Sequence, residues 1–273
     1  MNIIATLIKD ENQYLDEWIT YHLKLKFDKI ILFEDFDSVS HKDICDKYNN
    51  VELIPVYTIF SKDDFKHKYK KTVLYDYIKQ TYSNTWCLFS DVDEFLFFNN
   101  EFEDIVDFTN FLIKQNYSAA VIKMNIMTAS KRINKPNDIY SVVDTYTDSI
   151  SENELNINIQ KCKEHKLNLS KYSINVNTKL YIDLSAKSFF EHYPHTIKCV
   201  NNEKYYINNN IKLNHYVTKS LEEWYSKLVD RGYISYGSRK YFDDFFVVNY
   251  DMIDIYFEKF LNNNIKAKST HIS

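Results

Sequence analysis

The sequence predicts an α/β fold in which a mostly parallel central sheet carries helices on both faces. The first observation is a set of short, continuous apolar runs, which are typical of strands buried on both sides. The second is that segments with helical spacing separate these runs, and strands that alternate with helices favour parallel pairing. The runs lie at Asn2–Leu7, Lys29–Phe33, Val51–Val56 and Trp86–Phe89.

Between the first two runs, apolar residues recur at helical spacing with charged residues opposite them, which predicts an amphipathic helix. Its apolar positions are Tyr14, Leu15, Trp18, Ile19, His22 and Leu23. Similar reasoning predicts a short helix at His41–Tyr48 and a long, basic, aromatic-rich helix at Lys62–Tyr82. Trp86–Phe89 is therefore the fourth strand of the series.

The second half of the chain is less regular. A helix at Phe102–Gln115 and a strand at Ala119–Met127 continue the pattern, but Thr128–Thr178 is polar, Asn-rich and weakly periodic, so we expect an irregular insertion there. Ser220 followed by Glu223 is a capping box, which predicts a helix at Ser220–Val229. The remaining expected elements are short strands near Leu180, Lys187 and Tyr205, a strand at Ile211–Val217 and an amphipathic helix at Tyr250–Leu261.

Composition excludes several classes of protein. The net charge of -4 gives no electrostatic case for binding nucleic acid, whose partners usually carry a basic surplus. Gly232 and Gly237 are the only glycines, so neither a G-x-G-x-x-G motif nor a Walker A loop exists in the chain. A bound phosphate would have to be held by side chains and a metal ion.

The cysteines indicate a reducing compartment. Cys45, Cys87, Cys162 and Cys199 are far apart and show no metal-finger spacing, and Cys87 is expected to be a buried thiol because it lies in an apolar run. The N-terminus lacks a basic region followed by a long apolar segment, and we expect no signal peptide and no transmembrane helix. The expected location is the cytoplasm. The C-terminal helix is expected to pack on the domain, and contact with a membrane surface is the alternative.

Polar clusters follow three of the predicted strands, at Lys9–Asn12, Asp35–Ser38 and Asp91–Glu94. The carboxyl ends of parallel strands meet at one edge of a sheet, where ligands of open α/β sheets bind. This arrangement is typical of a nucleotide site.

Asp91 and Asp93 are the strongest candidates for metal ligands. If the segment stays extended, both side chains point to the same side, and a divalent cation would relieve their repulsion. Carboxylate oxygens favour Mg²⁺ or Mn²⁺. The alternative is a solvated acidic turn, which is less favoured because apolar residues flank the segment on both sides.

Several segments resemble, in order, the motifs of one group of enzymes. The chain reads K-D-E-N-Q-Y-L-D-E-W-I-T-Y-H-L at Lys9–Leu23, D-V-D-E-F at Asp91–Phe95 and N-H-Y-V-T-K-S-L-E-E-W at Asn214–Trp224, with Lys227 and Arg231-Gly232 beyond. These segments resemble the motifs of family 2-like and family 92-like glycosyltransferases. Weaker similarities are Asp35–Ser38, where Phe36 replaces the usual Asn, and Lys187-Ser188-Phe189. Residues 128–180 have no counterpart.

The resemblance implies a GT-A fold and transfer of a sugar from a UDP- or GDP-sugar to a hydroxyl of a glycan or glycolipid acceptor. It implies that Asp93 binds Mn²⁺ or Mg²⁺ directly, that Asp91 reaches the ribose or the metal through water, and that His215 completes the metal shell. Lys219 would add positive charge near the diphosphate. A core histidine and a surface lysine are the alternatives for His215 and Lys219.

The resemblance also implies contacts to the nucleotide. Asp10 and Glu11 would lie near the base and ribose, and Asp35 at the ribose or base. Capping of the following helix is the alternative for Asp10 and Asn12. Trp18 and His22 are expected to be core residues despite their place in the motif.

An inverting transferase needs a general base for the acceptor hydroxyl, whereas a retaining one does not. We favour Glu191, which follows a predicted strand; Asp183, Asp243 and Asp244 are rivals. His192 and His195 lack the i, i+4 spacing of a helical metal pair.

No linker is evident, so we expect a single domain: residues 1–127 would bind the nucleotide, 128–235 would bind the acceptor and complete the metal site, and 236–273 would be helical. A sugar-phosphate nucleotidyltransferase is an alternative, disfavoured because its usual glycine-rich opening loop is missing. A non-catalytic sugar-binding protein of the same fold is another, but a binder needs no metal-binding triad.

Overall fold

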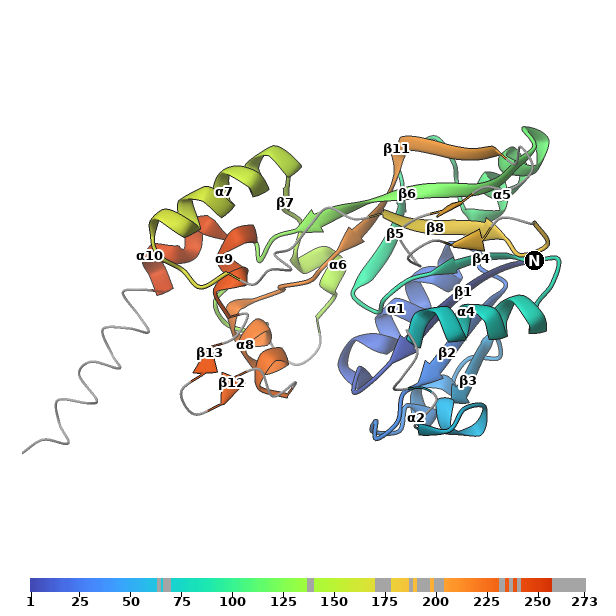
Figure 1. The fold of residues 1–273 in the computed structure, drawn as a ribbon, viewed down its shortest axis with the longest axis horizontal. Coiled ribbons are helices and arrows are strands. Elements are labelled where there is room, and N and C mark those ends of the chain that lie inside the picture. Colours follow the sequence, from blue (N-terminus) through green and yellow to red (C-terminus); the bar gives the residue numbers. More distant parts are fainter. Residues whose placement is uncertain are drawn as a thin grey trace, which may run out of the picture. The chain divides into compact units, whose positions relative to one another are not determined.

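The computed structural model describes residues 1–62, 65, 70–136, 140–169, 178–186, 189–190, 197–198, 204–230, 234–235, 238–239 and 242–256 (Figure 1). The chain divides into two compact units. Unit 1 comprises Met1–Met124 and Asn177–His215, and unit 2 comprises Asn125–Val176 and Tyr216–Ser273. The expected single-domain organisation stays a prediction.

Most strands in the described residues join one mixed sheet, in the order β3-β2-β1-β4-β8-β6-β11-β5, with β7 paired to β6. The strands are β1 (Asn2–Ile8), β2 (Lys29–Glu34), β3 (Val51–Pro55), β4 (Trp86–Phe89), β5 (Glu94–Phe98), β6 (Tyr117–Met127), β7 (Ser149–Ile150), β8 (Thr178–Asp183) and β11 (Lys204–His215). Two short hairpins lie outside this sheet: β9 (Phe189–Phe190) with β10 (Ile197–Lys198), and β12 (Ile234–Ser235) with β13 (Ser238–Arg239).

The first four strands pair in parallel, as the alternating pattern predicts. Ile8 of β1 is opposite Glu34 of β2, and Ala5 of β1 is opposite Phe89 of β4. The carboxyl ends of β1, β2 and β4 therefore share one edge of the sheet. This confirms that the three polar clusters follow strands that end at the same side.

The rest of the sheet is antiparallel where its pairing is recorded. β8 pairs antiparallel with both β4 and β6, and β5 pairs antiparallel with β11. A tight turn joins β4 to β5, and β5 does not lie beside β4 but at the far end of the strand order. Local periodicity does not reveal this arrangement, because strand order depends on long-range pairing.

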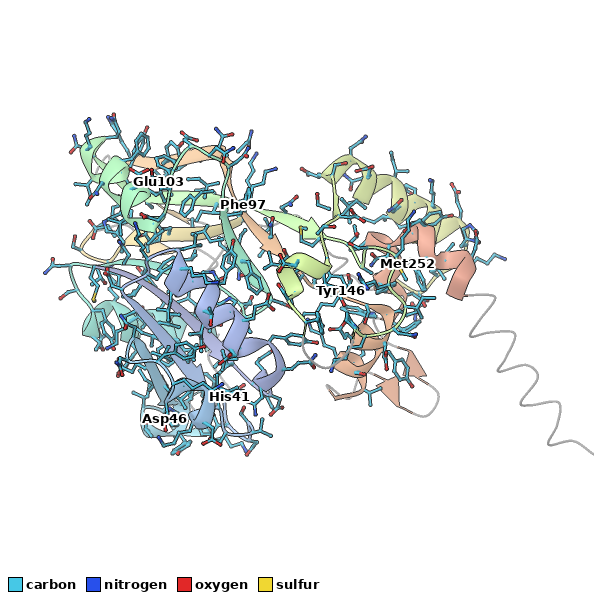
Figure 2. All side chains as sticks on the ribbon, turned by 180° about the vertical axis from the view of Figure 1, so that it is seen from behind. His41, Asp46, Phe97, Glu103, Tyr146 and Met252 are labelled. Atoms are coloured by element: carbon cyan, nitrogen blue, oxygen red, sulfur yellow. The ribbon has the colours of Figure 1, made fainter. Side chains whose placement is uncertain are left out.

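Helices cover both faces of the sheet, as predicted. On one face α4 (Lys70–Thr81) packs Leu74 and Ile78 against apolar residues of β1, β2 and β4. On the other face lie α1 (Asn12–Lys24) and α5 (Ile105–Lys114). Thr109 of α5 shares hydrogen bonds with the Tyr181 hydroxyl of β8 and the Asn2 amide of β1. Side chains fill the spaces between these elements (Figure 2).

Unit 2 contains the helices α6 (Val142–Thr145), α7 (Glu152–Glu164), α8 (Leu221–Asp230), α9 (Phe245–Val248) and α10 (Ile253–Tyr256). The capping box at Ser220 and Glu223 is confirmed: the backbone N–H of Glu223 donates to Ser220 Oγ, and that of Ser220 donates to Glu223 Oε2. The expectation of an irregular insertion at Thr128–Thr178 is wrong for α7. This helix buries only Leu155 and Cys162, so its apolar periodicity is too weak to detect.

Of the other elements, α5 and β6 agree with expectation within a few residues, whereas the short strand expected near Tyr205 and the strand expected at Ile211–Val217 form one continuous strand, β11. α2 (Lys42–Cys45) lies inside the predicted His41–Tyr48, and the predicted Tyr250–Leu261 contains α10 preceded by a 3-10 turn, with its last residues outside the described ranges. A second 3-10 turn follows β3 at Val56–Thr58, and a third is Phe242–Asp244. Cys87 is buried and free, as are Cys45 and Cys162, and Cys199 lies outside the described residues. Within the described part of the chain, no helix is long and apolar enough to cross a membrane.

Candidate functional site

The acidic segment after β4 forms a tight turn in place of an extended strand. The backbone N–H of Glu94 donates to the carbonyl of Asp91 at 3.0 Å, which closes the turn. The Glu94 side chain stabilises it from inside, because its Oε2 accepts from the backbone N–H of Asp91 at 2.8 Å and from Ser90 Oγ at 3.0 Å. The alternation argument for Asp91 and Asp93 therefore does not apply, and the turn itself sets their directions.

Lys179 of β8 lies beneath this turn. Its ammonium is 2.9 Å from Asp91 Oδ2 and 3.0 Å from Glu94 Oε2, and its side chain is 1% exposed. Burial by itself lowers the pKa of Lys179, but the two carboxylates outweigh it, so the net pKa is raised. The acidic turn thus contacts a buried cation on β8 that is paired with two carboxylates.

Asp93 lies beside His215. His215 ends β11 and is opposite Glu94 in the β5–β11 ladder, which brings its ring to the turn. Its Nε2 is 3.6 Å from Asp93 Oδ1, and both side chains are less than one-fifth exposed. Its Nδ1 is buried and has no hydrogen-bond partner among the described residues.

The distance between Asp93 Oδ1 and His215 Nε2 is one at which both atoms can bind the same divalent cation. Ligands about 2.1 Å from an ion such as Mg²⁺ lie about 3 Å apart when they subtend a right angle, and wider angles separate them further. Mn²⁺ accepts both carboxylate and imidazole ligands. No group of three or more His, Cys, Asp or Glu side chains with metal-site geometry occurs within the described residues. The structure brings Asp93 and His215 together and places Asp91 against Lys179, and the predicted set of three ligands stays a prediction.

Three side chains of α1 hold the strand that follows the turn. Trp18 Nε1 donates to the carbonyl of Glu94 at 2.9 Å, and the Tyr21 hydroxyl donates to the carbonyl of Leu96 at 2.8 Å. The backbone N–H of Leu96 donates to His22 Nε2 at 3.5 Å. β5 is the last strand in the order, so these side chains satisfy backbone groups that a further strand would otherwise pair.

His22 is a fully buried neutral ring. Its Nδ1 is 2.9 Å from the carbonyl of Trp18, so Nδ1 carries the hydrogen and Nε2 is the acceptor. Burial lowers the pKa of His22 from 6.5 to about 3. The prediction that Trp18 and His22 are core residues is confirmed, and their polar atoms also anchor β5.

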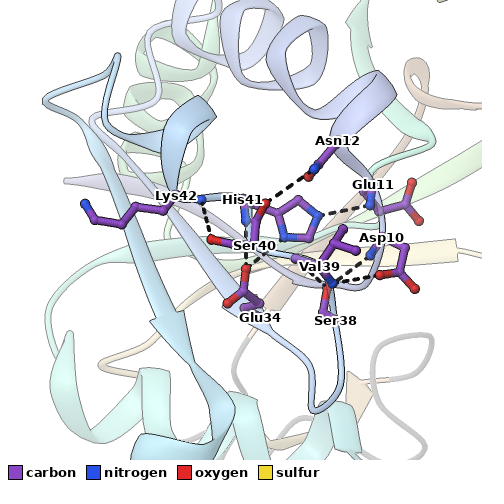
Figure 3. A network of polar contacts seen from close by, with 9 residues as sticks. All are labelled: Asp10, Glu11, Asn12, Glu34, Ser38, Val39, Ser40, His41 and Lys42. Carbon is purple, nitrogen blue, oxygen red and sulfur yellow. Dashed lines mark hydrogen bonds and ion pairs between the residues drawn. The ribbon is translucent and has the colours of Figure 1, made fainter.

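Asp10 joins the ends of β1 and β2 through backbone contacts (Figure 3). Asp10 Oδ1 accepts from the backbone N–H of Val39 at 2.9 Å, and its own N–H donates to Ser38 Oγ at 3.1 Å. The residue adopts a positive φ of 57°. It does not cap α1, whose first turn shows no side-chain cap, so the capping alternative for Asp10 is wrong.

His41 completes the same network (Figure 3). The backbone N–H of Glu11 donates to His41 Nε2 at 3.0 Å, and His41 Nδ1 donates to Glu34 Oε1 at 2.9 Å. Glu34 Oε1 also accepts from the backbone N–H of His41. The ring therefore fixes the backbone of Glu11, and the side chain of Glu11 is not part of this contact.

The remaining predicted residues are placed as follows. Asp35 follows β2, and its Oδ1 accepts from the backbone N–H of Phe36 at 2.8 Å. Lys219 belongs to unit 2, is 7% exposed and has a positive φ of 50°. Glu191 lies outside the described residues, as do His192 and His195.

Sequence reasoning missed Lys179 and His41. A lysine at the start of a short strand next to a polar, aperiodic segment carries no signal of burial. Its pairing with Asp91 spans 88 residues of the sequence. For His41, the signal available was its position seven residues after Glu34, just beyond a strand end.

Comparisons with known proteins give distant similarities. No protein-family model matches the chain, and no curated protein sequence matches it. One similar solved structure is a protein named as a glucose-1-phosphate thymidylyltransferase, from Bacillus anthracis, in complex with sucrose; it is 11% identical, with a TM-score of 0.30 over 50% of this chain and 60% of that chain. Another is the galactosyltransferase LgtC in complex with donor and acceptor sugar analogues, 12% identical, with a TM-score of 0.30 over 68% of this chain and 58% of that chain.

Both matches therefore cover less than two thirds of those proteins. At this TM-score neither similarity carries the case for function, which depends on the residues and contacts described above.

Proposed function

We propose that the protein is a metal-dependent glycosyltransferase that moves a sugar from a nucleotide-diphosphate sugar to an acceptor hydroxyl. The observation that supports this most is the pairing of Asp93 with His215 at 3.6 Å, on a turn at the carboxyl end of β4. A metal ion held by this pair would lie at the edge where β1, β2 and β4 end, and ligands of open α/β sheets bind at that edge.

The proposed chemistry requires neutralisation of a departing nucleoside diphosphate. A bound Mn²⁺ or Mg²⁺ would supply that positive charge. Asp93 and His215 would hold the ion, and Asp91 would contribute to the ion or the ribose. The scarcity of glycine supports this assignment, because the chain has no glycine-rich loop that could hold phosphates by backbone N–H groups.

The nucleoside would lie over the ends of β1 and β2. The network of Asp10, Ser38 and His41 shapes that edge through backbone contacts. Asp35 would then contact the ribose or base, and Glu11 would present its side chain to the base. Lys219 belongs to unit 2, and its predicted role near the diphosphate stays a prediction.

The acceptor is proposed to be a hydroxyl of a surface polysaccharide or a lipid-linked glycan. Glu191 is the proposed general base if the reaction inverts configuration. We propose a cytoplasmic location, with peripheral contact at the inner membrane face as the further proposal for a lipid-linked acceptor.

A thermal-shift experiment tests the proposal. The full chain is heated with UDP or GDP, each with and without Mn²⁺. A ligand at a hundred times its Kd stabilises by about 2.7 kcal/mol, which for a chain of this size raises Tm by roughly 5 to 10 °C. We expect such a shift with one of the two nucleotides and only in the presence of Mn²⁺.

Two variants sharpen the test. Asp93→Asn should lose the Mn²⁺-dependent shift, because it removes a charged ligand while keeping the side-chain shape. Asp43→Asn is the matched control, since Asp43 is exposed on α2, and should behave as the unaltered protein does. If neither nucleotide shifts Tm in a metal-dependent way, the proposal is wrong.

A further inference from the structure

Lys179 carries a positive charge at a buried position, where the loss of hydration is unfavourable. It lies in the centre of the sheet, on β8 between β4 and β6, and is 1% exposed. An ion taken from water into a protein interior loses several kcal/mol of hydration unless partners replace the water. Lys179 has two such partners, Asp91 Oδ2 at 2.9 Å and Glu94 Oε2 at 3.0 Å. Both belong to the acidic turn.

The ammonium of Lys179 contacts the carboxylates of Asp91 and Glu94, whereas the carboxylate of Asp93 lies beside His215. Glu94 is fully buried, and its Oε1 has no hydrogen-bond partner among the described residues, so Oε2 carries its contacts to Lys179, Ser90 and the Asp91 N–H. Asp91 is 36% exposed but directs Oδ2 inward to the ammonium. Asp93 is next to His215.

The charges of the turn are therefore divided. Formally, three carboxylates and one ammonium leave two negative charges, and the ammonium lies against two of the three carboxylates. Coulomb energy falls with distance, so Lys179 offsets Asp91 and Glu94 more than Asp93. The ammonium thus occupies Oδ2 of Asp91, whereas Oδ1 of Asp93 lies 3.6 Å from the His215 ring.

We propose that Lys179 is a positioning residue that holds Asp91 inward and thereby assigns direct metal binding to Asp93 and His215. This inference depends on the proposed function, since it concerns the same metal site. Lys179 contacts neither substrate nor metal in this role. It acts through Asp91 and Glu94.

A double-mutant comparison of Mn²⁺ binding tests this role. The dissociation constant is measured on the full chain from the electron paramagnetic resonance signal of free Mn²⁺, without nucleotide and without an activity assay. In the unaltered background, Asp93→Asn should weaken Mn²⁺ binding by at least about 30-fold, whereas Asp91→Asn should change it by less than about 3-fold.

The second background removes the buried ion pair. Lys179→Met alone would leave Glu94 as an uncompensated buried charge and could prevent folding, so it is combined with Glu94→Gln, which restores a neutral interior. In this Lys179→Met/Glu94→Gln protein Asp91 is released, and we expect Asp91→Asn to weaken Mn²⁺ binding by about 10-fold or more.

Lys179→Arg provides the rescue. It keeps the positive charge, so Asp91→Asn should again have an effect below about 3-fold. A merely structural lysine would change Tm but leave the effect of Asp91→Asn on Mn²⁺ binding the same in all backgrounds.

The outcomes separate the two proposals. If the unaltered protein does not bind Mn²⁺, the proposed function fails and this inference fails with it. If Mn²⁺ binds and depends on Asp93, but Asp91→Asn has equal effects with and without Lys179, only the role of Lys179 is refuted. An equal loss on Asp91→Asn and Asp93→Asn in the unaltered background also refutes it.

Discussion

Replacing His22 by glutamine should flatten the dependence of stability on pH between 5 and 7. His22 is fully buried, and its pKa is lowered from 6.5 to about 3. Below pH 6.5 the unfolded chain binds a proton at this site and the folded chain does not, so stability is fully present above pH 6.5 and falls as pH decreases toward 3.

The magnitude follows from the two pKa values. At pH 5 the proton favours the unfolded chain by about 2 kcal/mol relative to pH 7.5, and the loss approaches about 5 kcal/mol once pH falls below the folded value.

Urea unfolding monitored by tryptophan fluorescence measures this loss. Trp18 is a suitable reporter because its ring centroid is 4.5 Å from that of His22. We expect the unaltered protein to lose about 2 kcal/mol more than His22→Gln between pH 7.5 and pH 5. His165→Gln, at an exposed position, is the matched control and should keep the unaltered dependence. Equal pH dependence in the unaltered and His22→Gln proteins would refute the reasoning.

Three further predictions concern stability and reactivity. Trp18→Phe should lower the free energy of unfolding by about 1 to 2 kcal/mol, measured in urea, because it removes the donor to the Glu94 carbonyl while keeping a large ring; an unchanged value would contradict the anchoring role of α1. Glu223→Gln should lower Tm, because this carboxylate accepts hydrogen bonds from Tyr140, Tyr146 and Ser220, whereas exposed Glu152→Gln should not. Burial raises the pKa of the Cys87 thiol, and it raises the pKa of the Cys45 and Cys162 thiols to about 11. Alkylation at pH 8 followed by mass spectrometry should therefore label these three cysteines only after unfolding. Labelling of Cys87 in the native protein would show that its strand opens.

The early strands and helices were predictable because their patterns are local. β1, β2, β3 and β4 are apolar runs, and α1 repeats its apolar residues every three or four positions. Parallel pairing of the four strands then follows from their alternation with helices. α7 was missed because it buries only two residues, and its main start signal, the capping box at Ser151 and Glu154, lies in a polar segment.

The structural role of the Lys9–Leu23 motif, which is to hold β5, is visible only in the tertiary structure. Trp18, Tyr21 and His22 share one side of α1, which the sequence shows, but their hydrogen bonds reach β5 more than 70 residues later. The opening motif and the acidic segment are thus parts of one assembly. In the sequence they are two separate matches.

By itself, the sequence determined the α/β class, the common edge for the ends of β1, β2 and β4, and Asp93 as a candidate ligand. These depend on periodicity, on strand direction and on residue type, all of which are local. His215 became a candidate ligand only through the resemblance to glycosyltransferase motifs. Only the tertiary structure decided that Asp91 is held inward by Lys179 and that His215 lies 3.6 Å from Asp93. Such contacts depend on strand order and register, which are set by pairing between residues about 90 to 120 positions apart.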